Sequence, residues 1–276
     1  MNYLVGGFLF LLGSIIGSFL NVCIHRMPNR ESVVRPRSFC PSCRKTVAAY
    51  DNIPILSFLI LQGKCRSCGW KIPLRYPLVE LATACLFAGG YLWFGDDPRF
   101  AVFLPFVGIC VALFVIDAEH QLLPDLLTLP GTAIGLVLSP WNPILNPDGG
   151  FLAGMKWAAV GAVVGAAVPA VTIFAYWLIR GEQGMGWGDV KMLAMIGAFL
   201  GWDLTILSIV LSSFLGVAWW GLRTSVGKGG GLKEALPFGS FLALGAFASL
   251  LFGRLVLAWY GSFFPASAAT GLEWIG

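Results

Sequence analysis

Long runs without a charged residue constrain this chain more than any other feature of its sequence. Residues 1–24, 126–147 and 157–179 contain no Asp, Glu, Lys or Arg, and about 20 apolar residues suffice to span the hydrocarbon core of a bilayer. Charged residues make up 12% of the chain, about half of the 25% that is usual in soluble domains. We therefore expect an all-α polytopic membrane protein.

The uncharged runs, trimmed at proline, glycine and charged residues, give about eight expected transmembrane helices. They cover residues 3–24, 78–95, 100–117, 126–140, 157–179, 188–202, 204–222 and 237–258. The first expected helix has no basic residue ahead of it, whereas a cleaved secretory signal begins with a positively charged region. We therefore expect this helix to be retained.

The basic residues predict the orientation of the chain. If the N-terminus lies outside, the inner segments 25–77, 180–191 and 223–236 hold 15 of the 18 Lys and Arg residues. Loops rich in Lys and Arg stay in the cytoplasm, so both termini are expected on the outer side. The ten basic residues of segment 25–77 are not interleaved with exposed aromatic residues. Topology and anionic lipid account for them better than a nucleic acid does.

Two Cys-x-x-Cys pairs lie in the long inner loop, separated by 21 residues. Four thiolates on two tight turns are the ligand set of structural zinc, and Gly69 after the second pair lets the backbone turn under the metal. Two disulfides are the alternative, but an inner loop faces a reducing compartment. We expect zinc to bind the four cysteines, which are Cys40, Cys43, Cys65 and Cys68.

Two aspartates lie where expected helices meet the inner membrane face. Asp117 ends the third expected helix and Asp189 begins the sixth, after Gly186 and Gly188, and ionisable residues at this depth are costly. Two carboxylates in one poorly hydrated cleft share a proton, so that one can deprotonate water while the other protonates a scissile carbonyl oxygen. This is the logic of an aspartic protease. From the residues alone, the alternative is that both merely cap helices.

Three further charged residues near these helices have less specific interpretations. Glu80 begins the second expected helix and is a candidate to receive the positive end of a substrate. Lys191 either snorkels to lipid phosphate or turns inward toward Asp189. Asp125 is expected to be solvated at the interface.

Taken together, these motifs resemble those of the bacterial type IV prepilin peptidases, which are bifunctional leader peptidases and N-methyltransferases. The resemblance extends along most of the chain and includes the paired cysteines. On this resemblance, Asp117 and Asp189 are the catalytic aspartates, and the four cysteines hold structural zinc. The other segments that carry it are GSFLNV (17–22), DNIP (51–54), RYPLVE (75–80), IDAEHQLLPD (116–125), GWGDVK (186–191) and PFG (237–239).

The resemblance implies an aspartic endopeptidase of the bacterial inner membrane, with both termini in the periplasm. Its substrates would be type IV prepilins or type II secretion pseudopilins, whose basic leader is removed after a glycine at the cytoplasmic face. It would also methylate the new N-terminus from S-adenosylmethionine, for which the residues indicate no binding site. Membrane lipid is an expected partner and nucleic acid is not. The expected parts are a first transmembrane helix (1–24), a cytoplasmic zinc-binding loop domain (25–77) and a protease bundle (78–276).

Other functions remain open at this point. A presenilin-like peptidase also uses Gly-x-Gly-Asp, but its Tyr-Asp companion motif is missing because Asp117 follows Ile116. An ion-coupled secondary transporter would use Asp117 and Asp189 as proton or cation sites, and would show uptake that depends on an ion gradient. A scaffold of a secretion machine would not need the aspartates.

Overall fold

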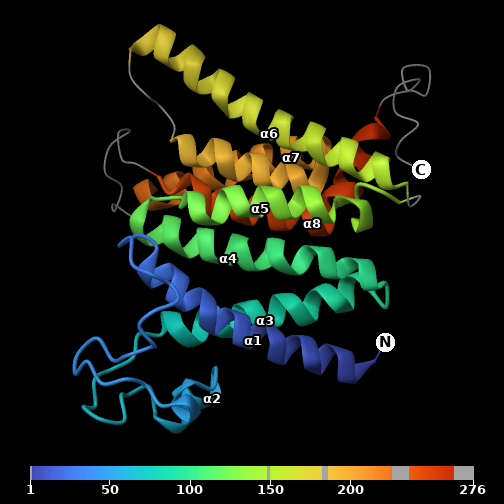
Figure 1. Cartoon of the computed structure of the whole chain (residues 1–276). Helices are drawn as coiled ribbons and strands as arrows, with labels where there is room; N and C mark the ends of the chain where they lie inside the picture. The colour runs from blue at the N-terminus through green and yellow to red at the C-terminus, as the bar shows by residue number, and fades with distance from the viewer. Residues whose placement is uncertain (1, 148–149, 182–185, 226–235, 264–276) are drawn as a thin grey trace.

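The computed structural model describes residues 2–147, 150–181, 186–225 and 236–263, and within them the long elements are all α-helices (Figure 1). The predicted all-α fold class is confirmed. The α-helices are α1 (Tyr3–Arg26), α2 (Leu56–Ile60), α3 (Arg75–Phe94), α4 (Phe103–His120), α5 (Asp125–Leu138), α6 (Phe151–Arg180), α7 (Trp187–Ser225) and α8 (Phe238–Gly261). Three short 3-10 helices join them: η1 (Ala49–Asn52), η2 (Pro98–Val102) and η3 (Ser139–Trp141).

Six helices of the described residues are long and apolar enough to cross a membrane: α1, α3, α4 with η2, α6, α7 and α8. The predicted number of eight is therefore not confirmed. It counted α5 and treated α7 as two helices. At about 1.5 Å per residue, the 14 residues of α5 reach about 21 Å, which is short of the roughly 30 Å hydrocarbon core.

The helix α7 reverses its direction at Gly201. This residue has φ 82° and ψ 173°, far from helical values. A Cβ atom added at Gly216 would lie 3.6 Å from Phe241, near the start of α8, whereas one added at Gly253, near the end of α8, would lie 2.5 Å from Leu204. The second half of α7 is therefore antiparallel to α8. The halves 187–200 and 202–225 correspond to the two expected helices 188–202 and 204–222.

The start of α6 differs from the sequence prediction. The helix begins at Phe151, whereas the expected helix begins at residue 157, where the uncharged run after Lys156 starts. Lys156 lies inside the helix, and its Nζ is 5.2 Å from the centre of the Trp157 ring. A lysine near a helix end can keep its ammonium at the interface while its stem follows the apolar surface. A single charged residue therefore does not mark the start of this helix.

Glycines let several helices approach one another closely. A Cβ atom on Gly161 of α6 would lie 2.2 Å from the carbonyl oxygen of Gly197 in α7, and one on Gly197 would lie 2.0 Å from that of Gly161. On the other side of the bundle, a Cβ on Gly17 of α1 would lie 2.7 Å from the Cα of Glu80 in α3. Packing through small residues is characteristic of membrane helices. It fixes α6 against α7 and α1 against α3.

The densest part of the interior lies between α4, α7 and α8. Its largest fully buried side chains include Phe106, Leu113 and Ile116 of α4 and Met192, Met195 and Phe199 of α7. The segment between α1 and α3, which includes α2, lies outside this bundle, at the end where α4 finishes and where α7 and α8 begin (Figure 1). The division of the chain into 1–24, 25–77 and 78–276 stays a prediction.

Candidate functional site

Asp117 lies in the last turn of α4, where the beginning of α8 is directed at its side chain. The carboxylate is buried, with 5% of the residue exposed. Its Oδ2 accepts a hydrogen bond of 2.6 Å from the backbone N–H of Ser240 and lies 3.0 Å from the Ser240 hydroxyl. A Cβ on Gly239 would lie 3.0 Å from Asp117 Cγ. The Ser240 N–H thus reaches the carboxylate from the beginning of α8, which is the positive end of that helix's dipole.

Asp189 lies in the first turn of α7 and is 8% exposed. Leu123, in the turn after α4, connects the two aspartate positions. A Cβ on Gly188 would lie 2.9 Å from Leu123 Cβ, and one on Gly239 would lie 2.8 Å from Leu123 Cδ2. The beginnings of α7 and α8 therefore meet around this leucine. The structure brings Asp117 and Asp189 to the same end of the bundle.

Two ion pairs lie beside the aspartates at this end of the bundle. Lys191 Nζ lies 2.7 Å from both carboxylate oxygens of Asp125. The lysine is therefore held on the α5 side by Asp125, so of its two proposed orientations the structure does not show the one turned inward toward Asp189. Arg75 at the start of α3 pairs with Glu119, two residues after Asp117. This second pair connects the α1–α3 half of the molecule to the end of α4.

The four cysteines of the loop come together as one cluster that could hold a metal ion. The Sγ atoms of Cys40, Cys43, Cys65 and Cys68 all lie within 4.8 Å of one another, and those of Cys40 and Cys68 are 3.8 Å apart. Four thiolates in tetrahedral geometry with metal–sulfur bonds of about 2.3 Å have sulfurs about 3.8 Å apart. The donor set and its spacing therefore fit a metal ion without a ligand position for water.

The two Cys-x-x-Cys turns share one backbone structure. Arg44 and Gly69, each directly after a pair, have φ of 60° and 71°, and the N–H of each donates to the carbonyl of the first cysteine of its pair, Cys40 or Cys65, at 2.9 Å. Gly69 was predicted to make this turn. Arg44 was not, because a left-handed conformation is unusual for residues other than glycine. The sequence signal for this turn was the position of Arg44 directly after the pair that ends at Cys43.

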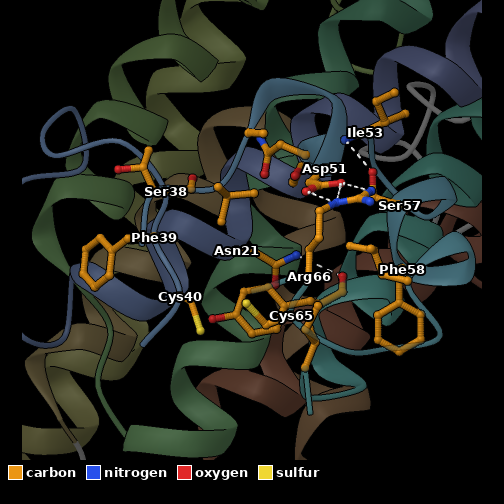
Figure 2. Close-up of a pocket in the computed structure, with 18 of the residues that line it drawn as sticks. Asn21, Ser38, Phe39, Cys40, Asp51, Ile53, Ser57, Phe58, Cys65 and Arg66 are labelled. Carbon is orange, nitrogen blue, oxygen red and sulfur yellow. Dashed lines mark hydrogen bonds and ion pairs between the residues drawn. The ribbon is translucent and has the colours of Figure 1, made fainter. Parts of the chain in front are cut away.

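Asp51 of the DNIP segment is fixed to the second cysteine turn. Arg66, between Cys65 and Cys68, donates to both of its carboxylate oxygens, with Nη2 2.7 Å from Oδ1 and Nε 2.8 Å from Oδ2. These hydrogen bonds from the Arg66 guanidinium hold the pKa of Asp51 below its usual range. The pair connects η1 to the metal cluster, as the dashed lines of Figure 2 show.

The comparisons with known proteins decide the family. Residues 11–94 match the Bacterial Peptidase A24 N-terminal domain, and residues 104–221 match the Type IV leader peptidase family. The chain belongs to the type IV leader peptidase family. The resemblance seen in the motifs is thereby confirmed. In this peptidase, the first match covers α1, the cysteine loop and α3, and the second covers both aspartates.

Curated relatives of this type IV leader peptidase carry one name, prepilin leader peptidase/N-methyltransferase. The relative from Burkholderia pseudomallei (strain 1026b) is 36% identical, covering 89% of this chain and 85% of its own length. That from Pseudomonas aeruginosa is 37% identical over 92% of each chain, and that from Aeromonas hydrophila is 36% identical over 94% and 95%. No solved structure matches the chain. Nothing in these comparisons supports a transporter.

Proposed function

We propose that this protein is a prepilin leader peptidase and N-methyltransferase of the bacterial inner membrane, with Asp117 and Asp189 as its catalytic aspartates. The observation that supports the proposal is the pair of buried carboxylates on α4 and α7, which lie at the same end of a membrane helix bundle. The names of the relatives supply the reaction. The substrates are type IV prepilins or type II secretion pseudopilins.

The surroundings of the two carboxylates suggest how they divide the chemistry. Asp117 accepts the Ser240 N–H at the beginning of α8, which stabilises its anion and suits it to take a proton from the attacking water. Asp189 then carries the proton that is given to the scissile carbonyl oxygen. Sharing one proton between two nearby carboxylates avoids placing two charges in a poorly hydrated site.

The charge distribution supports cleavage at the cytoplasmic face. The segments at the carboxylate end of the bundle hold most of the Lys and Arg residues, which indicates the cytoplasmic side, so both termini are periplasmic in this proposal. The apolar N-terminal helix of a pilin would lie beside the membrane helices while its basic leader remains in the cytosol. The basic loop would repel that leader, so we do not assign leader recognition to it.

The metal in the four-cysteine cluster is proposed to be structural zinc. Zinc takes four thiolates in tetrahedral geometry, and the sulfur spacing of the cluster fits that arrangement. With four protein ligands the ion has no position for water, so its role is to hold the loop together.

The test replaces each aspartate by asparagine and follows cleavage of a purified prepilin by the full-length enzyme in detergent. Asp117→Asn and Asp189→Asn should each lower the rate at least about 100-fold, because proton transfer by each group contributes about 10²–10⁴-fold. Asp203→Asn is the matched control, since Asp203 lies on α7 just after the reversal and pairs with Arg254. Near-normal cleavage by either active-site variant would exclude the pair.

A further inference from the structure

A cavity of about 430 Å³ lies between the four-cysteine loop and the inner ends of α1 and α3 (Figure 2). This volume falls within the roughly 300–1,000 Å³ of pockets that hold small ligands and cofactors. Neither Asp117 nor Asp189 lines it, so it is separate from the peptidase site. Its aromatic lining consists of Phe39, Tyr50, Phe58, Trp70 and Tyr76.

An amide of α1 that lines this cavity has an unsatisfied acceptor. Asn21 is 2% exposed, and its Nδ2 donates to the backbone carbonyl of Tyr76 at 2.9 Å. Its Oδ1 is buried and has no hydrogen-bond partner among the residues that the structure describes. Leaving a buried acceptor without a donor is unfavourable. A ligand N–H that reached this oxygen would supply the missing donor.

A buried carboxylate lies one helical turn away on the neighbouring helix. Glu80 is 9% exposed, and its Oε2 accepts from the backbone N–H of Ile55 at 2.7 Å. Within the described ranges it forms no ion pair. Gly17 packs on the Cα of Glu80, and Asn21, one turn later on α1, reaches Tyr76, one turn earlier on α3. Asn21 and Glu80 thus line the same interface between α1 and α3. A positively charged ligand group would interact favourably with both side chains.

We infer that this cavity binds S-adenosylmethionine and that Asn21 and Glu80 receive the α-amine of the cleaved pilin. The inference rests on the proposed N-methyltransferase function and gives that activity a site. Aromatic side chains suit the adenine ring, and a carboxylate suits both the sulfonium charge and the amine. The pair between Arg75 and Glu119 shows that this cavity and the peptidase site share one membrane face.

The proposed step balances without another reactant. The protonated α-amine first gives a proton to the Glu80 carboxylate. The nitrogen lone pair then forms a bond to the methyl carbon while the carbon–sulfur bond breaks and its electron pair returns to sulfur. The products are a methylated ammonium group and S-adenosylhomocysteine. The other charged or titratable groups that line the cavity, cysteines apart, are His25, Arg26, Lys45, Tyr50, Asp51, Arg66 and Tyr76.

The location is tested by direct binding of S-adenosylhomocysteine to the full-length protein, measured by calorimetry in detergent. Ala48→Trp fills the cavity, which Ala48 lines, and should weaken binding at least 10-fold. Leu59→Trp is the matched control, because Leu59 is exposed on α2 and does not line the cavity, and it should bind within twofold of the wild type. Metal content and thermal melting of both variants show that the loop is folded.

Two outcomes separate the cavity from the proposed function. If the wild type binds S-adenosylhomocysteine and methylates a pre-cleaved pilin, but Ala48→Trp binds equally well, the cavity is wrong and the methyltransferase stands. A wild type that neither binds nor methylates would overturn the methyltransferase function itself. If Leu59→Trp weakened the binding of S-adenosylhomocysteine as much as Ala48→Trp does, the assignment of the binding site to the cavity would also be overturned.

The role of Glu80 is tested with Glu80→Gln and a pre-cleaved pilin. The variant should bind S-adenosylhomocysteine within twofold of the wild type, while the ratio of methyl transfer to leader cleavage falls about 100-fold near neutral pH, as expected for loss of a general base. An N-terminal amine loses its proton unaided above a pH of about 8. The deficit should therefore shrink as the pH rises, whereas a pH-independent deficit or an unchanged ratio would overturn this role.

Discussion

The four-cysteine loop, residues 27–74, and the aspartate site of α4, α7 and α8 are built in opposite ways. Across the loop, the buried residues are Cys40 and Ser57, whereas ten of the 18 residues of α4 are buried. The packing of the helix bundle fixes the positions of the two aspartates. The loop has almost no core, so its shape depends on local hydrogen bonds and on the metal. Removing one stabilising element should therefore affect the two regions very differently.

The largest expected effect is that of metal removal on the loop. Binding of structural zinc by four ligands contributes about 10 kcal/mol or more to the folding of small metal domains. A zinc chelator, or Cys40→Ser, should make residues 27–74 at least 10-fold more sensitive to trypsin while the helices stay intact. Cys85→Ser is the control, because Cys85 is exposed on α3 away from the cluster. Equal proteolysis with and without metal would contradict this dependence.

A single methyl group should disturb the aspartate site without affecting the loop. In Gly239→Ala the added Cβ would lie 2.8 Å from Leu123 and 3.0 Å from Asp117 Cγ, so these side chains must give way, which disturbs the hydrogen bond from Ser240 to Asp117. We expect prepilin cleavage to fall at least about 10-fold, with normal metal content. Gly221→Ala, where no atom lies within 4 Å of the new Cβ, should cleave normally. Normal cleavage by Gly239→Ala would show that the contact is not needed.

A smaller effect is expected from separating α6 from α7. In Gly161→Ala the new Cβ would lie 2.2 Å from the carbonyl oxygen of Gly197, and overpacking of this kind costs about 1–3 kcal/mol. The melting temperature of the bundle should fall, while trypsin sensitivity of the loop stays unchanged. In Gly89→Ala the new Cβ has no atom within 4 Å, so this variant should not lower the melting temperature. A melting temperature equal to the wild type would refute this close packing.

The smallest effect is expected at the exposed ion pair beside the aspartate site. Asp125→Asn removes the partner of Lys191, and the Asp125 side chain is 56% exposed. Such surface pairs contribute less than about 1 kcal/mol. Both the melting temperature and the rate of prepilin cleavage should therefore remain close to the wild type. A 10-fold loss of cleavage would make Asp125 part of the site.

Much of the helical architecture could be predicted because hydropathy and charge are properties of short segments. The prediction failed where tertiary packing decides the outcome. Lys156 lies inside α6 and does not mark its start, since a lysine can extend its charge to the interface. The expected helix 126–140 is the short α5, whereas the expected helices 188–202 and 204–222 are the two halves of α7, which reverses its direction at Gly201.

For the candidate site, sequence reasoning found the residues that carry unusual chemistry. Two carboxylates at membrane depth and four paired cysteines are rare enough to be noticed in one chain. Ser240 and Leu123 were missed because neither residue type is unusual, and their importance arises only when α8 and the turn after α4 meet Asp117. The PFG segment before Ser240 was noticed in the sequence, but the sequence did not show that this segment packs against Asp117.

The hydrogen bond between Ser240 and Asp117 has a consequence for biogenesis, because it joins positions 123 residues apart. At a synthesis rate of roughly 5–20 residues per second, a ribosome needs roughly 6–25 seconds to make that interval. During this time the nascent polypeptide already contains the first aspartate but not the helix that completes its surroundings. We expect proteolytic competence to arise only when α8 is inserted, which would keep unfinished copies from cutting pilins awaiting export.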